Sequence, residues 1–257
     1  LTFVSPRTVR MRFATRPDGP VGNSGDRRSL MLASDVPTDS TWSAEETNEG
    51  WTFRSAAAVV HVRREPWLIE IHDAAGRLVT RTRTLDDPKT YSAPTPFSFI
   101  RRGRDLGRSV AASFALSHEE KLFGCGESFT RFNKRGQTIH LDVRDGMGVQ
   151  SKRMYKPVPF FMSSNGYGIF IHESAPITCD FGAEFDEAEV LYSGGSDLDL
   201  FLFVLQRSLL LQNFFLGQPV FRLQALHFLN FMIILANIHI INDRPDIASQ
   251  HQCCQKV

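Results

Sequence analysis

Short runs of alternating apolar and polar residues recur along the first 203 residues of the chain, with turn-forming residues between them. A period of two is the pattern of a half-buried β-strand. No segment before Phe203 keeps an apolar stripe at helical spacing over three turns. Since many short strands at intervals of about 8–12 residues favour a sandwich or barrel, we expect an all-β fold, a two-sheet β-sandwich. The alternating runs are residues 2–16, 50–65, 67–82 and 109–118.

Turn signals place the connections between these runs. Residues 73–76, Asp-Ala-Ala-Gly, separate two apolar runs, as in a hairpin whose glycine adopts positive φ. Pro66 cannot donate to a strand ladder and suits a turn or the start of a strand. Residues 17–49 are rich in Pro, Gly, Ser, Asp and Thr and predict a connection, in which only Leu30–Leu32 is apolar enough for a short strand. We expect Trp42 to cover the sandwich edge.

Residues 121–173 combine more signals than any other part of the sequence. The glycines of Gly124–Gly126 flank one small residue, which allows a sharp turn and a close approach to another group, but the third glycine of a dinucleotide site is missing. Asn165–Gly166 between two apolar runs predicts a second hairpin. The polar, glycine-containing residues 142–148 predict a protruding loop.

Charge gives no reason to expect nucleic acid as a partner, because 29 basic residues balance 28 acidic ones. One arginine-rich patch is interrupted by Asp105, and we interpret it as solvated loop charge. It comprises Arg101, Arg102, Arg104 and Arg108.

The residue types that carry catalysis or bind metals do not form a recognisable pattern. The four cysteines have neither zinc-site spacing nor that of a disulfide framework. His140 and His172 lack ligand partners at suitable spacing, so we expect no metal and no cofactor. Ser128 is outside any nucleophile-elbow pattern. We therefore expect no catalytic residue within this chain.

A series of motifs in a fixed order nevertheless resembles a known family. The motifs are Phe123–Phe129, Arg144–Gly146, Met154–Phe161 and Asn165–Phe170, with Glu65–Trp67 and Asp73–Leu78 upstream. They resemble glycoside hydrolase family 31, the α-glucosidases and α-xylosidases, and specifically the galactose-mutarotase-like β-sandwich that precedes the catalytic barrel. The resemblance spans roughly residues 5–203.

This resemblance implies a retaining α-glycosidase whose nucleophile and acid/base are aspartates of the barrel. Retaining chemistry needs two carboxyl groups about 5–5.5 Å apart. The sandwich of such an enzyme contributes a loop to the substrate cleft, and the position of Asp145 can hydrogen-bond sugar hydroxyls, since a carboxylate accepts from two at once. Val143 stands where the family often has Asn.

Each candidate side chain also has a structural interpretation, and the sequence leaves both open. Asp145 could cap a turn instead of binding sugar. Arg144 could pair with a carboxylate that holds the loop instead of contacting sugar directly. Glu127 could make a structural hydrogen bond at the turn. Tyr155 and Phe160 could belong to the core or line the cleft.

Residues 204–257 do not continue the family pattern and form no recognisable domain. A (β/α)8 barrel needs about 200–250 residues, and about 50 remain after Phe203. We expect an irregular or helical tail that arises from a reading-frame shift near Phe203. Residues 226–241 are densely apolar but shorter than the about 20 residues of a membrane span, so a membrane anchor is not expected.

The sequence supports two functional hypotheses. In the first, residues 1–203 are the amino-terminal domain of an α-glycosidase that removes terminal α-linked xylose or glucose from oligosaccharides, and its partner is a missing catalytic barrel. The chain alone would then not hydrolyse these sugars. In the second, the sandwich is a non-catalytic carbohydrate-binding or structural domain, with Trp42, Trp51 and Trp67 as exposed aromatic candidates. The chain starts at Leu1, which we interpret as a missing amino end, and the compartment is left open.

Overall fold

The computed structural model describes residues 1–15, 31–32, 36–83, 96–101, 103, 108–144, 154–186 and 188–205. These described residues form sixteen β-strands and no helix, which confirms the all-β prediction. Every strand lies in one compact unit, residues 1–25 and 37–210. A second unit comprises residues 26–36 and 211–257. In the part of the chain that the structure describes, no helix is long and apolar enough to cross a membrane.

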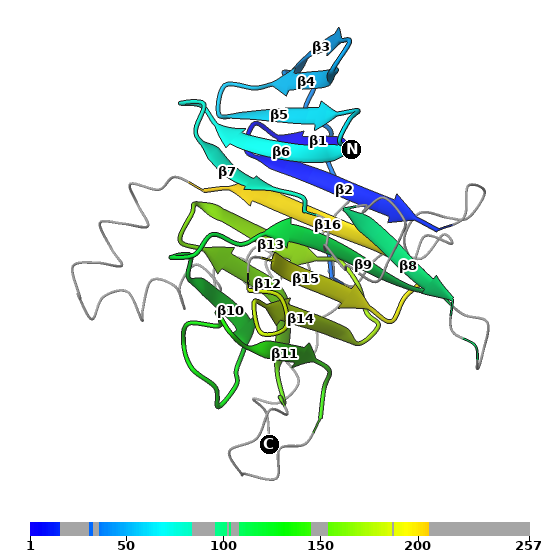
Figure 1. Ribbon diagram of the computed structural model, residues 1–257, viewed down its shortest axis with the longest axis vertical. Helices are drawn as coiled ribbons and strands as arrows, with labels where there is room; N and C mark the ends of the chain where they lie inside the picture. The colour runs from blue at the N-terminus through cyan, green and yellow to red at the C-terminus, as the bar shows by residue number, and fades with distance from the viewer. Residues whose placement is uncertain are drawn as a thin grey trace, which may run out of the picture. The chain divides into compact units, whose positions relative to one another are not determined.

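Six strands form an antiparallel sheet, sheet A, in the order β1-β2-β16-β13-β12-β10 (Figure 1). The strand bounds are β1 Thr2–Ser5, β2 Thr8–Ala14, β16 Asp197–Val204, β13 Tyr167–Ile171, β12 Pro157–Ser163 and β10 Leu122–Gly126. β2 pairs with β16, with Met11 opposite Leu200. This pairing brings the first residues of the chain beside the last strand of the domain.

Two further antiparallel sheets complete the sandwich. Sheet C has the order β11-β14-β15-β9-β8 and sheet B the order β3-β4-β5-β6-β7. Sheet C consists of β11 Thr138–Leu141, β14 Ile177–Phe181, β15 Ala188–Ser193, β9 Arg108–Ala115 and β8 Phe97–Arg101. Sheet B consists of β3 Ser43–Thr47, β4 Gly50–Arg54, β5 Ala58–Arg63, β6 Leu68–Asp73 and β7 Leu78–Arg81. An isolated bridge between Thr82 and Phe114 joins the end of β7 to β9.

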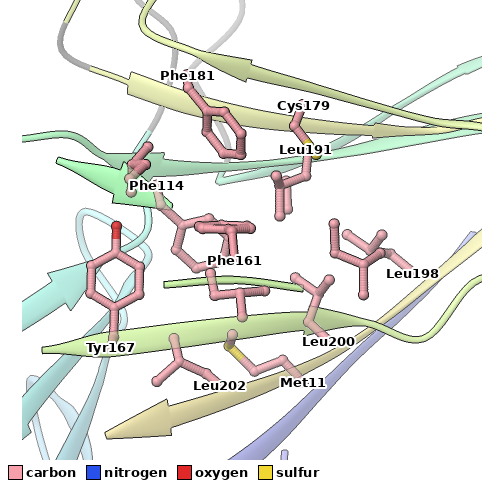
Figure 2. Packing of buried hydrophobic residues seen from close by; sticks show 14 of the residues in the cluster. Met11, Phe114, Phe161, Tyr167, Cys179, Phe181, Leu191, Leu198, Leu200 and Leu202 are labelled. Atoms are coloured by element: carbon pink, nitrogen blue, oxygen red, sulfur yellow. The ribbon is translucent and has the colours of Figure 1, made fainter. Parts of the chain in front are cut away.

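The alternating residues of all three sheets share one apolar core. Alternate residues of a strand point to opposite faces, and in β16 the residues that enter the core are Leu198, Leu200, Leu202 and Val204. Figure 2 shows Phe161 and Leu200 of sheet A packed toward Leu191 and Phe181 of sheet C. The sandwich prediction is therefore confirmed, because sheet A buries one face against strands of sheets B and C.

Both predicted hairpins are present. Gly76 joins β6 to β7 at φ 78° and donates its N–H to the Asp73 carbonyl at 2.9 Å. Gly166 joins β12 to β13 at φ 95° and donates to the Ser163 carbonyl at 3.1 Å. Pro66 lies in the turn between β5 and β6, as expected.

In the region interpreted as a connection, residues 17–49, the structure has a strand at a different position from the predicted one. Met31 and Leu32 are not in a strand, and Leu30 lies outside the described residues, whereas β3 forms at Ser43–Thr47. All five β3 residues are exposed, so this edge strand carries no apolar alternation. Trp42 packs at the edge as predicted, with its ring stacked on Phe3 at 4.3 Å.

The arginine patch is also partly strand. Arg101 ends β8 and pairs with Arg108 at the start of β9. The prediction that these two arginines lie in a loop is therefore wrong. The Arg108 guanidinium carbon lies 5.1 Å from the centroid of the Phe99 ring, which belongs to the edge strand β8. Arg102 and Arg104 lie outside the described residues.

Candidate functional site

A glycine-rich bulge in β10 organises the end of the sandwich from which the predicted loop leaves. Gly124, Cys125 and Gly126 have φ values of 125°, 68° and 89°. A Cβ atom on Gly124 would lie 2.6 Å from the Phe160 carbonyl oxygen, and one on Gly126 would lie 2.2 Å from that of Lys156. The prediction of a close approach is confirmed, and the glycines lie at the end of β10, where its register with β12 shifts. Only glycine fits both flanking positions.

The two chain segments at the base of the loop, residues 142–144 and 154–156, form what we call the loop neck. Val143 and Met154 make an isolated parallel bridge, and the Arg144 N–H donates to the Met154 carbonyl at 2.9 Å. Met154 is 2% exposed and belongs to the core, so it anchors the neck. The Glu127 N–H donates to the Lys156 carbonyl at 3.2 Å and ties the bulge to the neck.

Of the two predicted sugar-binding residues, Arg144 belongs to this neck. Arg144 is described, and Asp145 is the first residue of a segment, 145–153, that lies outside the described residues. The Arg144 Nε donates to Asp142 Oδ2 at 2.6 Å, and the two side chains are 65% and 31% exposed. An ion pair this open to water contributes less than about 1 kcal/mol to stability. Neither residue's contact with sugar is tested by this geometry, and both stay predictions.

The remaining candidates of the motif region separate into surface and packing residues. The Glu127 carboxylate lies 3.7 Å from the Lys156 ammonium, and both side chains are about three-quarters exposed, whereas the Glu127 backbone N–H makes the structural hydrogen bond to Lys156. Tyr155 is 50% exposed, which contradicts a core position. Phe160 is half-buried and packs over Gly168 and against Phe203.

Exposed apolar side chains occur in the neck and in the segment that follows β10. Phe129 is 65% exposed, Phe132 is 73% exposed and Val143 is 72% exposed. The Phe132 ring rests on that of Phe123, with centroids 5.0 Å apart. Large exposed aromatic groups on one part of a surface mark contact sites for ligands or partner domains.

A buried lysine holds the segment that carries these phenylalanines. Lys134 is 5% exposed, and its ammonium donates to Ser128 Oγ at 2.9 Å and Thr130 Oγ1 at 2.8 Å. Burial lowers the pKa of Lys134. Asn133 Oδ1 accepts the N–H groups of Leu122 and of Arg135, each at 3.1 Å. The sequence reasoning missed this scaffold; its signal was the Ser, Thr, Asn and Lys content of residues 128–134.

The histidines and tryptophans singled out from the sequence have structural partners. His140 contacts the Thr178 hydroxyl at 3.1 Å, and His172 contacts Asp199 at 2.8 Å. Within the described ranges, no group of three or more His, Cys, Asp or Glu residues could hold a metal ion. Trp51 is 37% exposed with the Arg64 guanidinium over its ring at 4.4 Å, and Trp67 is 46% exposed with its ring 5.9 Å from that of Phe97.

Comparison with known proteins decides the family. A family model described as the glycosyl hydrolase 31 N-terminal galactose mutarotase-like domain matches residues 1–180. The chain belongs to glycoside hydrolase family 31. This confirms the resemblance that the ordered motifs indicated.

Two α-xylosidases are among the curated relatives of this family 31 chain. That of Lactiplantibacillus pentosus is 35% identical over 43% of this chain and 13% of the relative. That of Emericella nidulans is 36% identical over 35% of this chain and 12% of the relative. The chain thus spans about an eighth of the length of these proteins.

Solved family 31 structures share the fold. The dextranase of Flavobacterium johnsoniae superposes with a TM-score of 0.63 at 20% identity, over 78% of this chain and 23% of that chain. An α-xylosidase from a soil metagenome superposes with a TM-score of 0.59 at 17% identity, over 77% of this chain and 28% of that chain. In both, the matched part is the smaller share of a longer protein.

Proposed function

We propose that this family 31 chain is the amino-terminal sandwich of a retaining α-glycosidase that removes terminal α-linked xylose or glucose from oligosaccharides. Its role is to supply one wall of the substrate cleft, while the catalytic carboxylates belong to a barrel domain. The α-xylosidase relatives, of which this chain spans only 13% and 12%, support both parts of the proposal.

The loop neck is the observation that carries the proposed role. A side chain that positions a substrate must be held by a rigid support. The neck provides one, because Met154 is buried and accepts the Arg144 N–H, and the glycine bulge presses against Lys156. Asp145 follows directly after this support. A carboxylate there would accept hydrogen bonds from two sugar hydroxyls.

The carboxyl groups inside the sandwich are not suited to the bond-breaking step. Glu120, Glu189 and Asp199 are each at most 2% exposed. The Glu120 carboxylate accepts hydrogen bonds from Ser163 and Asn165, and Asp199 is paired with Arg10. A sugar cannot reach these groups without opening the core. The described part of the sandwich would therefore bind and orient substrate, and the two reacting carboxyl groups would come from the barrel.

A chimeric enzyme tests this proposal. Residues 1–204 of this chain would replace the matching region of the Lactiplantibacillus pentosus α-xylosidase, and hydrolysis of an aryl α-xyloside would be measured. We expect activity, and we expect Asp145→Ala to lower kcat/KM about tenfold without abolishing turnover, as for one lost charge-assisted hydrogen bond. The exposed Glu46→Gln serves as control. An unchanged kcat/KM in the Asp145 variant would show that Asp145 does not bind substrate and would favour its alternative interpretation as a turn cap.

The exposed phenylalanines favour a second candidate, a sandwich that binds carbohydrate without catalysis. Phe129 is 65% exposed on a segment that Lys134 holds in place. Calorimetric titration of the whole chain with gluco- and xylo-oligosaccharides separates the two candidates. A cleft wall alone should bind in the millimolar range or more weakly, whereas a self-sufficient binding domain should bind more tightly and lose affinity in Phe129→Ala.

A further inference from the structure

Two cysteines lie inside the sandwich on strands of different sheets. Cys125 belongs to β10 of sheet A, and Cys179 belongs to β14 of sheet C. Both residues are completely buried, both are members of the apolar core, and both carry free thiols. Their spacing in the sequence matches no disulfide framework, so it is the fold that relates them to each other.

The contacts around these cysteines bring the two side chains together across the core. Gly124, the neighbour of Cys125, is paired with Phe161, whose ring lies 4.9 Å from that of Phe181. Cys179 and Phe181 are two residues apart in β14, so both side chains point to the same face, toward the core. Figure 2 shows Cys179 and Phe181 on this strand above Phe161. The Cys179 thiol makes a side-chain hydrogen bond with Cys125, which places the two sulfurs side by side.

A short segment also fastens the two strands to each other near the thiols. The Lys134 N–H donates to the Leu122 carbonyl of β10 at 2.8 Å, and the Gly136 N–H donates to the Phe181 carbonyl of β14 at 2.7 Å. Because Lys134 and Gly136 are only two positions apart, they hold β10 and β14 at a short separation. A covalent bond between the two thiols would therefore join strands that the folded domain already keeps together.

We propose that Cys125 and Cys179 form a disulfide that links the two layers when the chain folds in the presence of a low-molecular-weight disulfide such as oxidised glutathione. An inter-sheet disulfide inside the core is compatible with a sandwich, because antibody domains contain one. The thiolate of one cysteine attacks the small disulfide, which forms a mixed disulfide and releases one small thiol. The thiolate of the second cysteine attacks the protein sulfur of the mixed disulfide, which closes the Cys125–Cys179 bond and releases the other small thiol. Two protein thiols are oxidised, one small disulfide is reduced, and the two released thiols carry away the two protons.

Burial determines when this reaction can occur. The hydrogen bond with Cys125, and next burial, raise the pKa of the Cys179 thiol well above its usual value. The thiolate is the form that attacks a disulfide, and neither cysteine of the folded domain is accessible to a small molecule. The exchange therefore belongs to folding, before the core closes. The closed core then protects the disulfide from reduction.

Oxidative refolding tests the proposal without relying on activity. The whole chain with Cys253→Ser and Cys254→Ser, which leaves only the two core cysteines, would be unfolded and reduced in urea and then refolded with a mixture of reduced and oxidised glutathione. After alkylation, we expect a mass lower by two hydrogens than that of the reduced chain, no alkylated cysteine, and a peptide map in which Cys125 is joined to Cys179. The midpoint of urea unfolding should rise by about 1 M or more relative to the reduced protein, because the cross-link restricts the unfolded chain.

The matched control is Cys125→Ala in the same background, or Cys179→Ala if that variant does not fold. Neither variant can close the bond, so glutathione should leave its urea midpoint unchanged. Refolded protein in which both thiols remain free, or in which either cysteine carries glutathione, would overturn the proposal. A disulfide that forms but lowers the urea midpoint, or that forms only in misfolded protein, would also overturn it, because the native sandwich would then not accommodate the bond.

Discussion

The Tyr167 hydroxyl donates a hydrogen bond to Glu189 Oε2 over 3.2 Å and so joins β13 of sheet A to β15 of sheet C inside the sandwich. Both residues are completely buried, and Figure 2 shows the Tyr167 hydroxyl pointing away from its strand into the interior. Glu189 Oε1 has no hydrogen-bond partner in the described residues. Burial, and next the nearby charge of Glu120, raise the pKa of Glu189 well above its usual range. The folded domain therefore binds the Glu189 proton more tightly than the unfolded chain does.

This relationship predicts how stability depends on pH. Because the folded state holds the Glu189 proton more tightly than the unfolded state, its contribution is fully present below the ordinary glutamate pKa and is lost as pH rises through the folded-state pKa. Glu189→Gln keeps a neutral acceptor for Tyr167. We expect urea unfolding to show that this variant is more stable than wild type at high pH and that the loss with rising pH is reduced. Tyr167→Phe, which retains the carboxyl group, should keep that loss; equal pH profiles for wild type and Glu189→Gln would contradict the assignment.

Asp199 predicts the opposite pH dependence. Burial would raise its pKa, but hydrogen bonds from Arg10 and His172 outweigh burial, and the pKa is lowered. The folded state therefore binds this proton less tightly, and the stabilisation is present above the ordinary aspartate pKa and is lost as pH falls through the folded-state pKa. We expect Asp199→Asn to cost about 3 kcal/mol near neutral pH, because it leaves Arg10 unpaired in a half-buried position, and less in acid.

Chemical denaturation at neutral and acid pH measures this difference. Glu46→Gln is the control, since the Glu46 and Arg64 side chains are 61% and 41% exposed and their pair should contribute less than about 1 kcal/mol. A cost for Asp199→Asn that is the same at both pH values would show that the loss is not electrostatic.

Alanine substitutions at two glycines distinguish the cost of backbone strain from the cost of a steric clash. Gly76 and Gly126 have φ values of 78° and 89°, so alanine is disfavoured at both. A Cβ at position 76 meets no atom within 4 Å, whereas one at position 126 would lie 2.2 Å from the Lys156 carbonyl oxygen. We expect Gly76→Ala to cost about 1 kcal/mol and Gly126→Ala about 3 kcal/mol or more. Urea unfolding measures the loss of stability in each variant. Equal losses for Gly76→Ala and Gly126→Ala would mean that β10 does not press on the loop neck.

Local chemistry made much of the fold predictable. The hairpins at Gly76 and Gly166 follow from turn residues between apolar runs, and the core strands follow from their period of two. β3 was not predicted, because Ser43–Thr47 is exposed along its whole length and lacks the alternating apolar residues that indicate a strand. A short strand was predicted at Leu30–Leu32 instead, where three apolar residues follow one another without alternation.

Long-range relationships could not be read from the sequence. Arg10 and Asp199 are separated by 189 positions, and nothing near either residue indicates the other. The Lys134 hydrogen bonds to Ser128 and Thr130 likewise depend on the segment folding back on β10, where the Lys134 N–H donates to the Leu122 carbonyl at 2.8 Å. For the candidate site, the ordered motifs identified the family and the loop, whereas the neck that supports the loop required the pairing of Val143 with Met154.

The ion pair between Arg144 and Asp142 gives a test of what Arg144 does. If Arg144 acts only by holding the neck through Asp142 at 2.6 Å, then in the chimeric enzyme Arg144→Ala and Asp142→Ala should each lower kcat/KM about threefold, and the double variant should be no worse than either. We expect this result because the pair is exposed and its partners are only two residues apart. A much larger loss for Arg144→Ala than for Asp142→Ala, with additive effects in the double variant, would show instead that the guanidinium contacts the sugar directly.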